Sequence, residues 1–540
     1  MPRPLRETLL RYAPAAMIVV AGLLAYSNAF SAPFVFDGVK FVRDSPAIRQ
    51  LWPPTRFLRS NRPVGQLSFA LNYAVHGTDV WGYHAVNVGI HLAAGLLLFG
   101  IVRRTLQMQP MFTATADDRR QLGPKRRRSQ EDGPASAGWS TATWLALAAT
   151  LVWTLHPLQT QSVTYLYQRY ESLMGMLVLA SVYAFIRGAQ AREGRFWYAA
   201  GAACCLLAMG TKETAAVVPL VLLWYDRAFL ADSWREVARR RGLLHGPLLA
   251  VLAGGIVYVA WNQAWYAGGG VLAYEKVSTL EYARSQPGVI LHYLRLAFWP
   301  AGQCLDYGWP VAQTPWQIVP PLLAIGVMLG LTAWAAWRRP ALGFLGGWFF
   351  LFLAPTSSFA PIIDLAFEHR MYLPLAAVAV PAVLGFYRLA EWTLKSPRWA
   401  VRERQAFCTV VLGAAVVALA VTTHRRNEVY QSEATAWLDV VEKAPQNARG
   451  HYNLAHALED VGDFDRARRH YRRAVELDPD DAVSHSNLAN ILAQVDGDVE
   501  SAIEHYHRAI AVAPEYAAAR ANLGAVLGQL GRTEEAMTHC

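Results

Sequence analysis

Long apolar runs alternate with short polar segments from the N-terminus to about Thr423. Each run is about 17–25 residues long, which is the length that a helix needs to cross the hydrocarbon core of a bilayer. The sequence therefore predicts a polytopic integral membrane protein over most of its length. After Thr423 the pattern changes to shorter amphipathic stretches.

About eleven membrane spans are expected, including a retained first anchor. We expect them at about 9–30, 83–104, 139–155, 317–337, 341–354, 371–390 and 405–423, with four more between 171 and 266. Basic clusters at Lys125–Arg128 and Arg239–Arg241 favour cytoplasmic loops at those positions, with the N-terminus inside and the C-terminus outside. The apolar piece at 289–299 is too short to cross and is interpreted as an interfacial or re-entrant helix.

The C-terminal part contains a repeat. Asn453–Ala455 recurs as Asn487–Ala489 and as Asn522–Gly524, at offsets of 34 and 35 residues. This period is typical of tetratricopeptide repeats, which are built from paired helices. We expect the extra residue in the turn near Asp496–Asp498, and a further helix from a degenerate repeat at Ala434–Ala444.

The predicted fold class is all-α, a membrane helix bundle followed by an α-solenoid. The predicted domains are a transmembrane domain at 1–423, a linker with the degenerate repeat helix at 424–446, and a repeat domain at 447–540. The repeat domain would hold about three repeats, the last incomplete.

Composition and charge agree with this organisation. Hydrophobic residues make up 54% of the chain and charged residues 17%, and the formal net charge is +10. Because the arginines and lysines collect beside the spans, they are interpreted as topology signals, and no nucleic-acid partner is expected. The five cysteines show no metal-ligand spacing.

The ionisable groups at the membrane edge gather on the predicted outside face. They are Asp37, Arg62, His84, His156, Arg169, Glu171, Lys212, Glu213, Asp306, Glu368, His369 and Arg370. A transporter would be expected to place such groups near the bilayer midplane. A concentration at one face favours an enzyme that acts there.

Asp37 is the most informative of these groups. It follows the aromatic stretch Pro33–Phe36, where burial makes a carboxylate expensive to keep charged. It could take a proton from an acceptor hydroxyl or ligate a divalent metal. The alternatives are that Asp37 only marks the membrane boundary, and that each nearby cation is only an interfacial side chain.

A series of motifs carries a resemblance to a known family. The motifs are Phe34–Asp37, Asn61–Pro63, Trp81–His84 with Asn87 and His91, Leu155–Pro157, Gln168–Glu171, Lys212–Thr214, Leu305–Tyr307 and Glu368–Pro374. In this order, and with the terminal repeats, the chain resembles the TMTC-type family of transmembrane and tetratricopeptide-repeat-containing O-mannosyltransferases and their bacterial relatives. The resemblance implies a GT-C glycosyltransferase fold, a polyprenyl-phosphate sugar as donor, and repeats on the same side as the active site.

The resemblance also puts Asp37 at the family's usual catalytic position. Cations can stabilise a phosphate leaving group, so the candidates for the donor phosphate are Arg169, Lys212, His369 and Arg370. The remaining candidate site residues are Arg62, His84, His156, Glu171, Glu213, Asp306 and Glu368. The chain departs from the family pattern in two places. Gly38 replaces a second acid beside Asp37. Gln168–Glu171 keeps a cation and an acid, but its side chains are bulkier than those of the Gly-Arg-Ala-Asp-like segment of the family.

Two functions from different classes are compatible with these features. The leading hypothesis is a glycosyltransferase acting on protein hydroxyls, with the concave repeats presenting an extended acceptor polypeptide. The alternative is a catalytically inactive, membrane-anchored scaffold for protein assembly. The expected location is the plasma (inner) membrane with periplasmic repeats, or the endoplasmic reticulum membrane in a eukaryote. Membrane lipids are expected partners, and a divalent metal, with Asp37 as its ligand, remains an open alternative.

Overall fold

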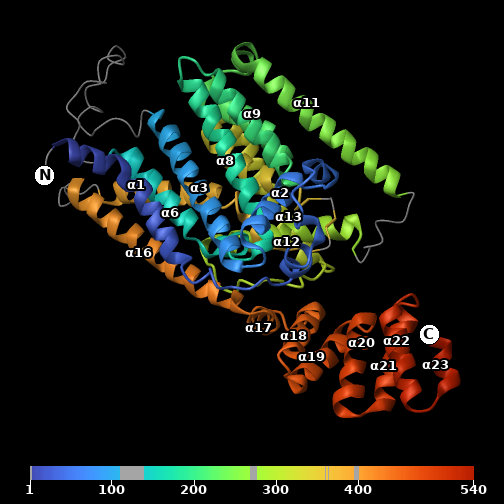
Figure 1. Ribbon diagram of the computed structural model, residues 1–540. Coiled ribbons are helices and arrows are strands. Elements are labelled where there is room, and N and C mark those ends of the chain that lie inside the picture. Colours follow the sequence, from blue (N-terminus) through green and yellow to red (C-terminus); the bar gives the residue numbers. More distant parts are fainter. Residues whose placement is uncertain are drawn as a thin grey trace, which may run out of the picture. The chain divides into compact units, whose positions relative to one another are not determined.

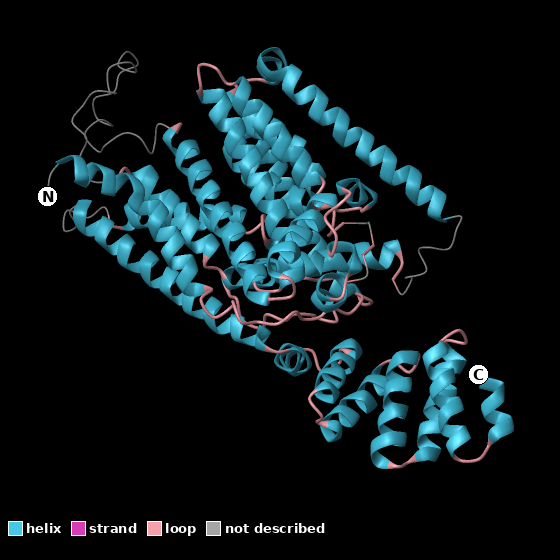
Figure 2. Ribbon diagram, viewed as in Figure 1, coloured by secondary structure: helices cyan, strands magenta, loops and turns pink. Residues whose placement is uncertain are grey.

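The computed structural model describes residues 3–109, 139–267, 277–358, 361–362, 364–394 and 401–539. All regular elements within these residues are helices (Figure 2). The chain divides into two compact units. The membrane unit comprises Met1–Ala301, Val311–Ile363 and Glu368–Glu428, and the repeat unit comprises Gly302–Pro310, Asp364–Phe367 and Val429–Cys540.

The membrane unit contains the long helices of the chain (Figure 1). They are α1 (Arg3–Ala25), α2 (Pro63–His76), α3 (Val80–Gln107), α6 (Thr141–Thr154), α7 (Thr160–Val163), α8 (Arg169–Gln190), α9 (Arg195–Met209), α10 (Val218–Tyr225), α11 (Trp234–Ala267), α12 (Thr279–Phe298), α13 (Pro315–Arg338), α14 (Pro340–Leu353), α15 (Ala376–Thr393) and α16 (Val401–Glu428). A helix lies at each range where a span is expected. The basic cluster Lys125–Arg128 lies outside the described residues.

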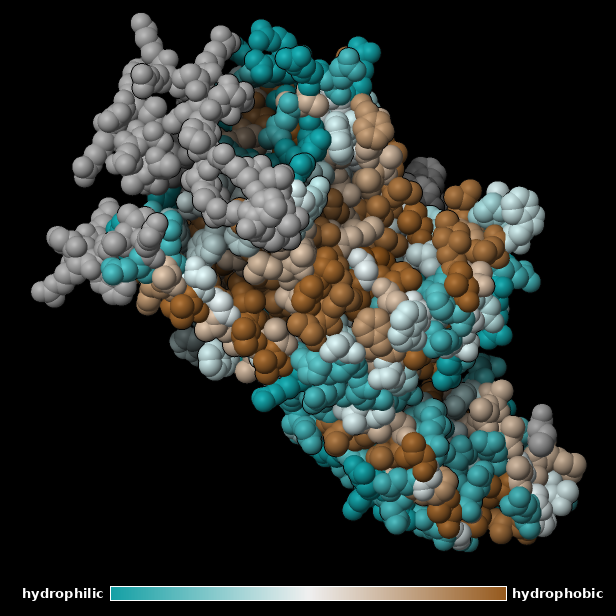
Figure 3. Space-filling view, turned by 60° about the vertical axis from the view of Figure 1, so that its left-hand side comes forward, coloured by the Kyte–Doolittle hydropathy of each residue, from teal (hydrophilic) through white to brown (hydrophobic). Residues whose placement is uncertain are grey.

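Four of the described helices are long and apolar enough to cross a membrane: Val80–Gln107, Leu166–Gln190, Pro315–Arg338 and Glu403–Gln431. The third and fourth expose most of their apolar side chains; for example, Trp316, Leu323 and Val410 are 84%, 65% and 70% exposed. Figure 3 shows hydrophobic residues gathered over a broad face of the protein. Exposed apolar surface of this extent is expected where lipid is the solvent. The chain is a membrane protein, while the total of about eleven spans stays a prediction.

The segment between α1 and α3 is folded and contains a helix that the sequence does not predict. It contains α2, which begins at Pro63, the first helical position that proline favours. Phe34, Phe69 and Tyr83 pack together in a buried aromatic core with Tyr170 of α8. This core fixes the polar residues of the segment against α3 and α8. At Gly65 a Cβ would come within 2.2 Å of the Tyr170 ring, so only glycine permits this contact.

The repeat unit contains seven helices among its described residues. They are α17 (Glu433–Lys443), α18 (Ala448–Asp460), α19 (Phe464–Leu477), α20 (Ala482–Ile491), α21 (Val499–Val512), α22 (Ala517–Gln529) and α23 (Thr533–His539). The helix predicted at Ala434–Ala444 is present as α17. The extra residue is taken up where predicted, because α20 runs into a π-helical turn, Leu492–Asp496, that Gly497 ends with a φ of +71°.

Two upstream segments fold with the repeats. Arg449 of α18 donates from Nε to Asp306 at 2.7 Å and from Nη2 to Asp364. The Asn447 amide donates to the backbone carbonyl of Asp306 at 3.2 Å, and Lys443 Nζ donates to that of Gln303 at 2.6 Å. Burial disfavours the charged form of Asp306, but the positive charge and hydrogen bond of Arg449 favour it more strongly. The pKa of the Asp306 carboxyl therefore lies below its ordinary value. Asp306, a predicted site residue, is thus a component of the repeat unit.

Candidate active site

Asp37 stands at a turn of unusual backbone geometry. Phe36 has a φ of +50°, a left-handed conformation that a bulky side chain rarely adopts. Residues in such conformations gather at functional sites, where the surrounding structure holds them. The backbone N–H of Asp37 donates to the Tyr165 hydroxyl at 3.2 Å. Burial is the main cause that holds the pKa of Tyr165 well above its ordinary value, and the negative charge of Asp37 is the second. This hydroxyl therefore keeps its proton.

A row of aromatic rings leads from Asp37 to Arg62. Phe36 stacks on Tyr165 at a centroid distance of 6.4 Å, Tyr165 lies 6.3 Å from Tyr167, and Tyr167 lies 5.4 Å from Tyr170. The guanidinium of Arg62 lies over the Tyr170 ring at 5.4 Å. Aromatic faces of this kind bind cations and can also stack on flat apolar surfaces of a ligand.

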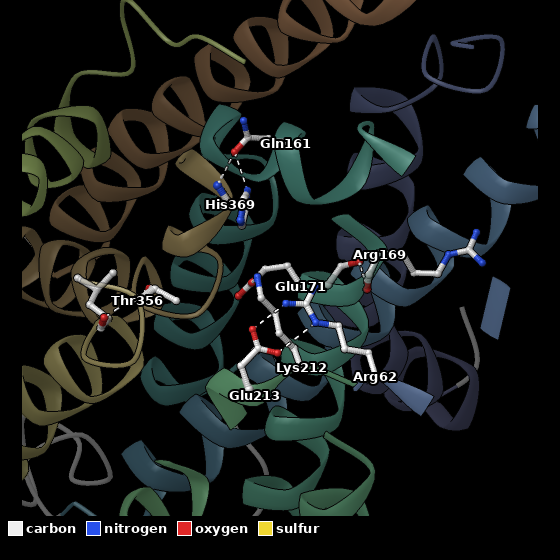
Figure 4. A network of polar contacts seen from close by, with 10 residues as sticks. Arg62, Gln161, Arg169, Glu171, Lys212, Glu213, Thr356 and His369 are labelled. Carbon is white, nitrogen blue, oxygen red and sulfur yellow. Dashed lines mark hydrogen bonds and ion pairs between the residues drawn. The ribbon is translucent and has the colours of Figure 1, made fainter. Parts of the chain in front are cut away.

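Arg62 and Glu213 form a bidentate ion pair (Figure 4). Arg62 Nη2 and Nε lie 2.7 and 3.1 Å from the two carboxylate oxygens of Glu213. Burial disfavours the charged form of each side chain, but the attraction and hydrogen bonds between Arg62 and Glu213 are stronger than this effect. The pKa of Glu213 therefore lies below its ordinary value, and that of Arg62 lies above. The pair joins the start of α2 to the segment after α9, which are also joined by a hydrogen bond from Val64 N–H to the Gly210 carbonyl at 3.0 Å.

Lys212 and Glu171 form a second, more deeply buried ion pair. Lys212 Nζ lies 2.6 Å from Glu171 Oε2, and the two side chains are 8% and 6% exposed. Figure 4 shows this pair beside the Arg62–Glu213 pair. Two cations and two carboxylates from three distant parts of the sequence therefore meet in one place.

His369 lies in the 3-10 turn Glu368–Met371 close to these ion pairs. Gln161 Oε1 accepts from the His369 backbone N–H at 2.7 Å and lies 3.0 Å from His369 Nδ1. Burial is the main cause that holds the pKa of His369 well below its ordinary value, and the charges of Lys212, Arg370 and Arg62 add to it. The imidazole is therefore neutral and surrounded by positive charge.

Arg370 and Glu368 are also buried in this turn. Arg370 Nη1 donates to the backbone carbonyl of Thr356 at 3.0 Å and lies 3.4 Å from the Tyr282 hydroxyl. The Tyr282 hydroxyl donates to the same carbonyl at 2.5 Å. Arg370 is 6% exposed and Glu368 is fully buried.

Arg169 is held apart from the ion pairs. Its guanidinium is fully buried and donates to Asn87 at 2.6 Å and to Asn72 at 2.8 Å. It also donates to the backbone carbonyl of Tyr83 at 3.0 Å and lies over the Phe69 ring at 4.4 Å. In Figure 4 the side chain extends away from Glu171 and Lys212. The phosphate-binding role of Arg169 stays a prediction, and these contacts connect α8 to α2 and α3.

His84 and His156 each contact a backbone carbonyl. His84 Nε2 lies 2.8 Å from the carbonyl of Ala32, and His156 Nε2 lies 3.1 Å from that of Ala297. His156 Nδ1 accepts from the Leu158 N–H at 3.2 Å, so its proton is on Nε2. Burial lowers the pKa of His156 to about 4. His84 thus contacts the segment after α1, and neutral His156 contacts the last turn of α12.

Several residues that contact the site are not apparent from the sequence. Gln161 and Tyr165 lie between Leu155 and Glu171, in a segment that is predicted to lie outside, but nothing in their spacing distinguishes them from other polar residues. Asn72 is equally inconspicuous. Within the described parts of the chain, no three His, Cys, Asp or Glu side chains gather in a way that could hold a metal ion. Water, backbone carbonyl or substrate oxygens would have to complete the coordination of any divalent ion held by Asp37.

Together, the helical membrane unit, the polar site and the terminal helix pairs define a membrane protein with a tetratricopeptide array. The tetratricopeptide repeat model matches residues 448–481, and a second model, described as TPR repeat, matches residues 496–531. The array predicted from the sequence is thus confirmed.

Curated relatives cover most of the chain. Protein O-mannosyl-transferase Tmtc3 of Drosophila melanogaster is 24% identical, over 87% of this chain and 56% of its own length. Human TMTC1 is 24% identical over 88% of this chain and 56% of its own length. Human TMTC4 is 25% identical over 83% of this chain and 64% of its own length. The chain spans little more than half to two thirds of the length of these relatives. It is a distant homologue of the TMTC protein O-mannosyl-transferases, as the motif series predicted.

Proposed function

We propose that the chain is a membrane glycosyltransferase that moves a sugar from a polyprenyl-phosphate donor to a protein hydroxyl on the extracytoplasmic face. The observation that carries this proposal is the charge around His369. Lys212, Arg370 and Arg62 all lie near enough to depress its pKa, and Arg62 and Asp37 both lie near enough to Tyr167 to shift the pKa of that hydroxyl. Cations suit a phosphate leaving group and the Asp37 carboxylate suits a general base, while Glu171 and Glu213 hold Lys212 and Arg62 in ion pairs.

The proposed reaction needs one proton acceptor and one anion site. The acceptor hydroxyl oxygen attacks C1 of the sugar, and the bond between C1 and the phosphate oxygen breaks. The hydroxyl proton goes to the Asp37 carboxylate, and polyprenyl phosphate leaves with the bonding electron pair. Attack opposite to the leaving group inverts the configuration at C1.

The cations have complementary roles in this proposal. Lys212 and Arg370 stabilise the negative charge of the departing phosphate, and neutral His369, whose Nδ1 faces Gln161, accepts a hydrogen bond at Nε2. Arg62 orients the Glu213 carboxylate through their bidentate ion pair. Arg169 positions α8 against α2 and α3 in the present state, and would contact the phosphate only after exchanging its hydrogen bonds with Asn72 and Asn87.

The proposal includes a topology and a location. We propose about eleven spans with domain limits at 423 and 446, the N-terminus in the cytoplasm and the repeats outside. The membrane would be the bacterial inner membrane, or that of the endoplasmic reticulum in a eukaryote. The names of the relatives support protein as the acceptor and mannose as the first sugar to test.

The decisive test is a conservative change at Asp37. Asp37→Asn should abolish sugar transfer from a polyprenyl-phosphate donor to protein, while expression and repeat folding stay intact. The matched control is Asp44→Asn in the same segment, where the carboxylate pairs with Arg43 at 2.9 Å on the exposed surface. Undiminished product from Asp37→Asn would refute the assignment. If the purified protein neither binds nor consumes any polyprenyl-phosphate sugar, the scaffold hypothesis replaces this one.

A further inference from the structure

A cavity lies in the membrane unit, between α3, α14, α15 and the turn that follows α10. Its volume is about 800 Å³, which is within the usual range for small-molecule sites. Most of its lining is apolar, with contributions such as Leu98, Val102, Phe344, Leu345 and Leu384. A cavity of this kind accepts a long hydrocarbon chain.

The cavity is far from the candidate active site along the same helix. Asn87, which contacts Arg169, is near the start of α3, whereas Thr105 lines the cavity near its end. The 18 residues between them correspond to about 27 Å of helix. That distance is close to the thickness of the hydrocarbon core, which is about 30 Å. The cavity is therefore at the opposite membrane face, beyond the reach of a donor phosphate at Asp37.

Positive charge surrounds one part of the cavity. Its lining includes Arg338, Arg339 and Arg388, and it includes no Asp or Glu among the described residues. Arg388 is paired with Glu391 at 3.0 Å. Within the parts of the chain that the structure describes, neither Arg338 nor Arg339 has a carboxylate partner, and both are exposed. Guanidinium groups bind phosphate through paired hydrogen bonds.

We propose that this cavity binds an anionic phospholipid of the leaflet opposite the active site. The acyl chains lie along the apolar lining, and the headgroup phosphate lies between Arg338 and Arg339. Charge complementarity selects this occupant, because a neutral lipid would leave two adjacent arginines uncompensated. Anionic lipids also concentrate at the cytoplasmic surface, where the predicted topology places this end of α3.

One variant fills the cavity without disturbing the fold. Gly385 lines the cavity in α15, and a Cβ built there meets no atom within 4 Å. Gly385→Leu puts a side chain into the space and replaces glycine by a strong helix former, so α15 keeps its structure. Arg338→Gln and Arg339→Gln remove the charges and leave the apolar lining unchanged. Arg425→Gln, an exposed arginine near the other end of the membrane unit, is the matched charge control.

The test measures lipid retained by the purified full chain. The protein is incubated in detergent with phosphatidylglycerol, phosphatidylcholine or polyprenyl phosphate, and bound lipid is counted by native mass spectrometry. We expect one phosphatidylglycerol per chain, at least a tenfold loss in Gly385→Leu and in the double variant of Arg338 and Arg339, and no loss in Arg425→Gln. Equal retention of phosphatidylcholine, preferential retention of polyprenyl phosphate, or equal binding by all variants would overturn the proposal. The readout does not depend on sugar transfer.

Discussion

Gln161 Oε1 accepts two hydrogen bonds from His369, one from the backbone N–H at 2.7 Å and one from Nδ1 at 3.0 Å. The backbone N–H can only donate, so the amide oxygen rather than the amide nitrogen must face it. Nδ1, which meets the same oxygen, must then carry the imidazole proton. The lone pair of neutral His369 is thus on Nε2, and the tautomer follows from one glutamine.

Changing this glutamine should change how the site responds to pH. Burial and the nearby cations hold the pKa of His369 well below its ordinary value, so the unmodified protein should show no His369 titration in its neutral-pH activity profile. In Gln161→Glu a carboxylate would stabilise the imidazolium and raise the pKa of His369. We expect transfer activity to acquire a new pH-dependent step near neutrality. The measurement is product formation as a function of pH. An unchanged pH profile in Gln161→Glu would contradict the contact assigned between Gln161 and His369 Nδ1.

Gln161→Leu provides the control for that experiment. It leaves two buried donors of His369 without their acceptor, which should lower the free energy of unfolding by about 1–3 kcal/mol. The pH profile of the remaining activity should keep its original form, because no charge is added. A Gln161→Leu protein as stable as the unmodified one would show that this acceptor is dispensable.

A second acid can be introduced at Gly38 to test whether the family pattern improves the site. Gly38 has helical backbone angles of −62° and −33°, and a Cβ there would meet only Phe34 atoms at 3.8 Å. We expect Gly38→Asp to change the free energy of unfolding by no more than about 0.5 kcal/mol. If Asp37 binds a metal together with its substrate, this variant should respond more strongly to added Mg²⁺. Thermal unfolding and transfer assays with and without Mg²⁺ measure the two effects.

Gly65→Ala is the matched contrast. Its Cβ would come within 2.2 Å of the Tyr170 ring, so the aromatic core beneath Asp37 must shift. Overpacking of this kind costs about 1–3 kcal/mol. Equal stability of Gly38→Asp and Gly65→Ala would contradict the described packing of this segment.

The predictions from sequence succeed where structure is local and fail where contacts are distant. The apolar runs and the repeat period specify helices within a few tens of residues, so helices occur at the expected ranges. The 31–82 segment is rich in tryptophan and proline and shows no helical period, so α2 was missed. Arg169 illustrates the limit for sites, because its charge suggested a ligand, but its partners Asn72 and Asn87 become adjacent only after folding.

The Lys212–Glu171 pair should show strong energetic coupling. Lys212→Met leaves Glu171 as a buried carboxylate without its partner, which should destabilise the membrane unit by about 3–5 kcal/mol. Lys212→Met with Glu171→Leu removes both charges and should recover most of that stability. Activity should not return in the double variant, because the proposed phosphate cation is still absent. Detergent-resistance and transfer assays on both variants measure this, and additive destabilisation would contradict the coupling.

Two histidine pairs should make the repeats sensitive to acid. His451 and His470 have their Nδ1 atoms 3.0 Å apart, and His485 and His505 repeat this contact at 3.0 Å. Burial is the main cause that lowers the pKa of His470 to about 4, and the charge of its partner His451 is the second. The unfolded chain, with the ordinary value of 6.5, binds more protons over this interval, so stability falls as the pH falls from about 6.5 to about 4.

Hydrogen exchange of α18–α21 at pH 7 and pH 5 in the full chain would measure this loss. We expect lower protection factors at pH 5, after correction for the slower intrinsic exchange of amides at that pH, and a smaller difference in His470→Leu combined with His505→Leu. Equal pH dependence in that variant would show that the paired histidines are not responsible.

The contacts of Arg449 have a consequence for anyone who isolates the repeats. A fragment that begins at Val429 contains α17 to α23, yet it omits Gly302–Pro310 and Asp364–Phe367 of the same compact unit. Arg449, Asn447 and Lys443 would then lose the partners that they contact in the full chain. Such a fragment would have an artificially frayed first helix pair, and peptide affinities measured on it would describe a surface that the intact protein does not present.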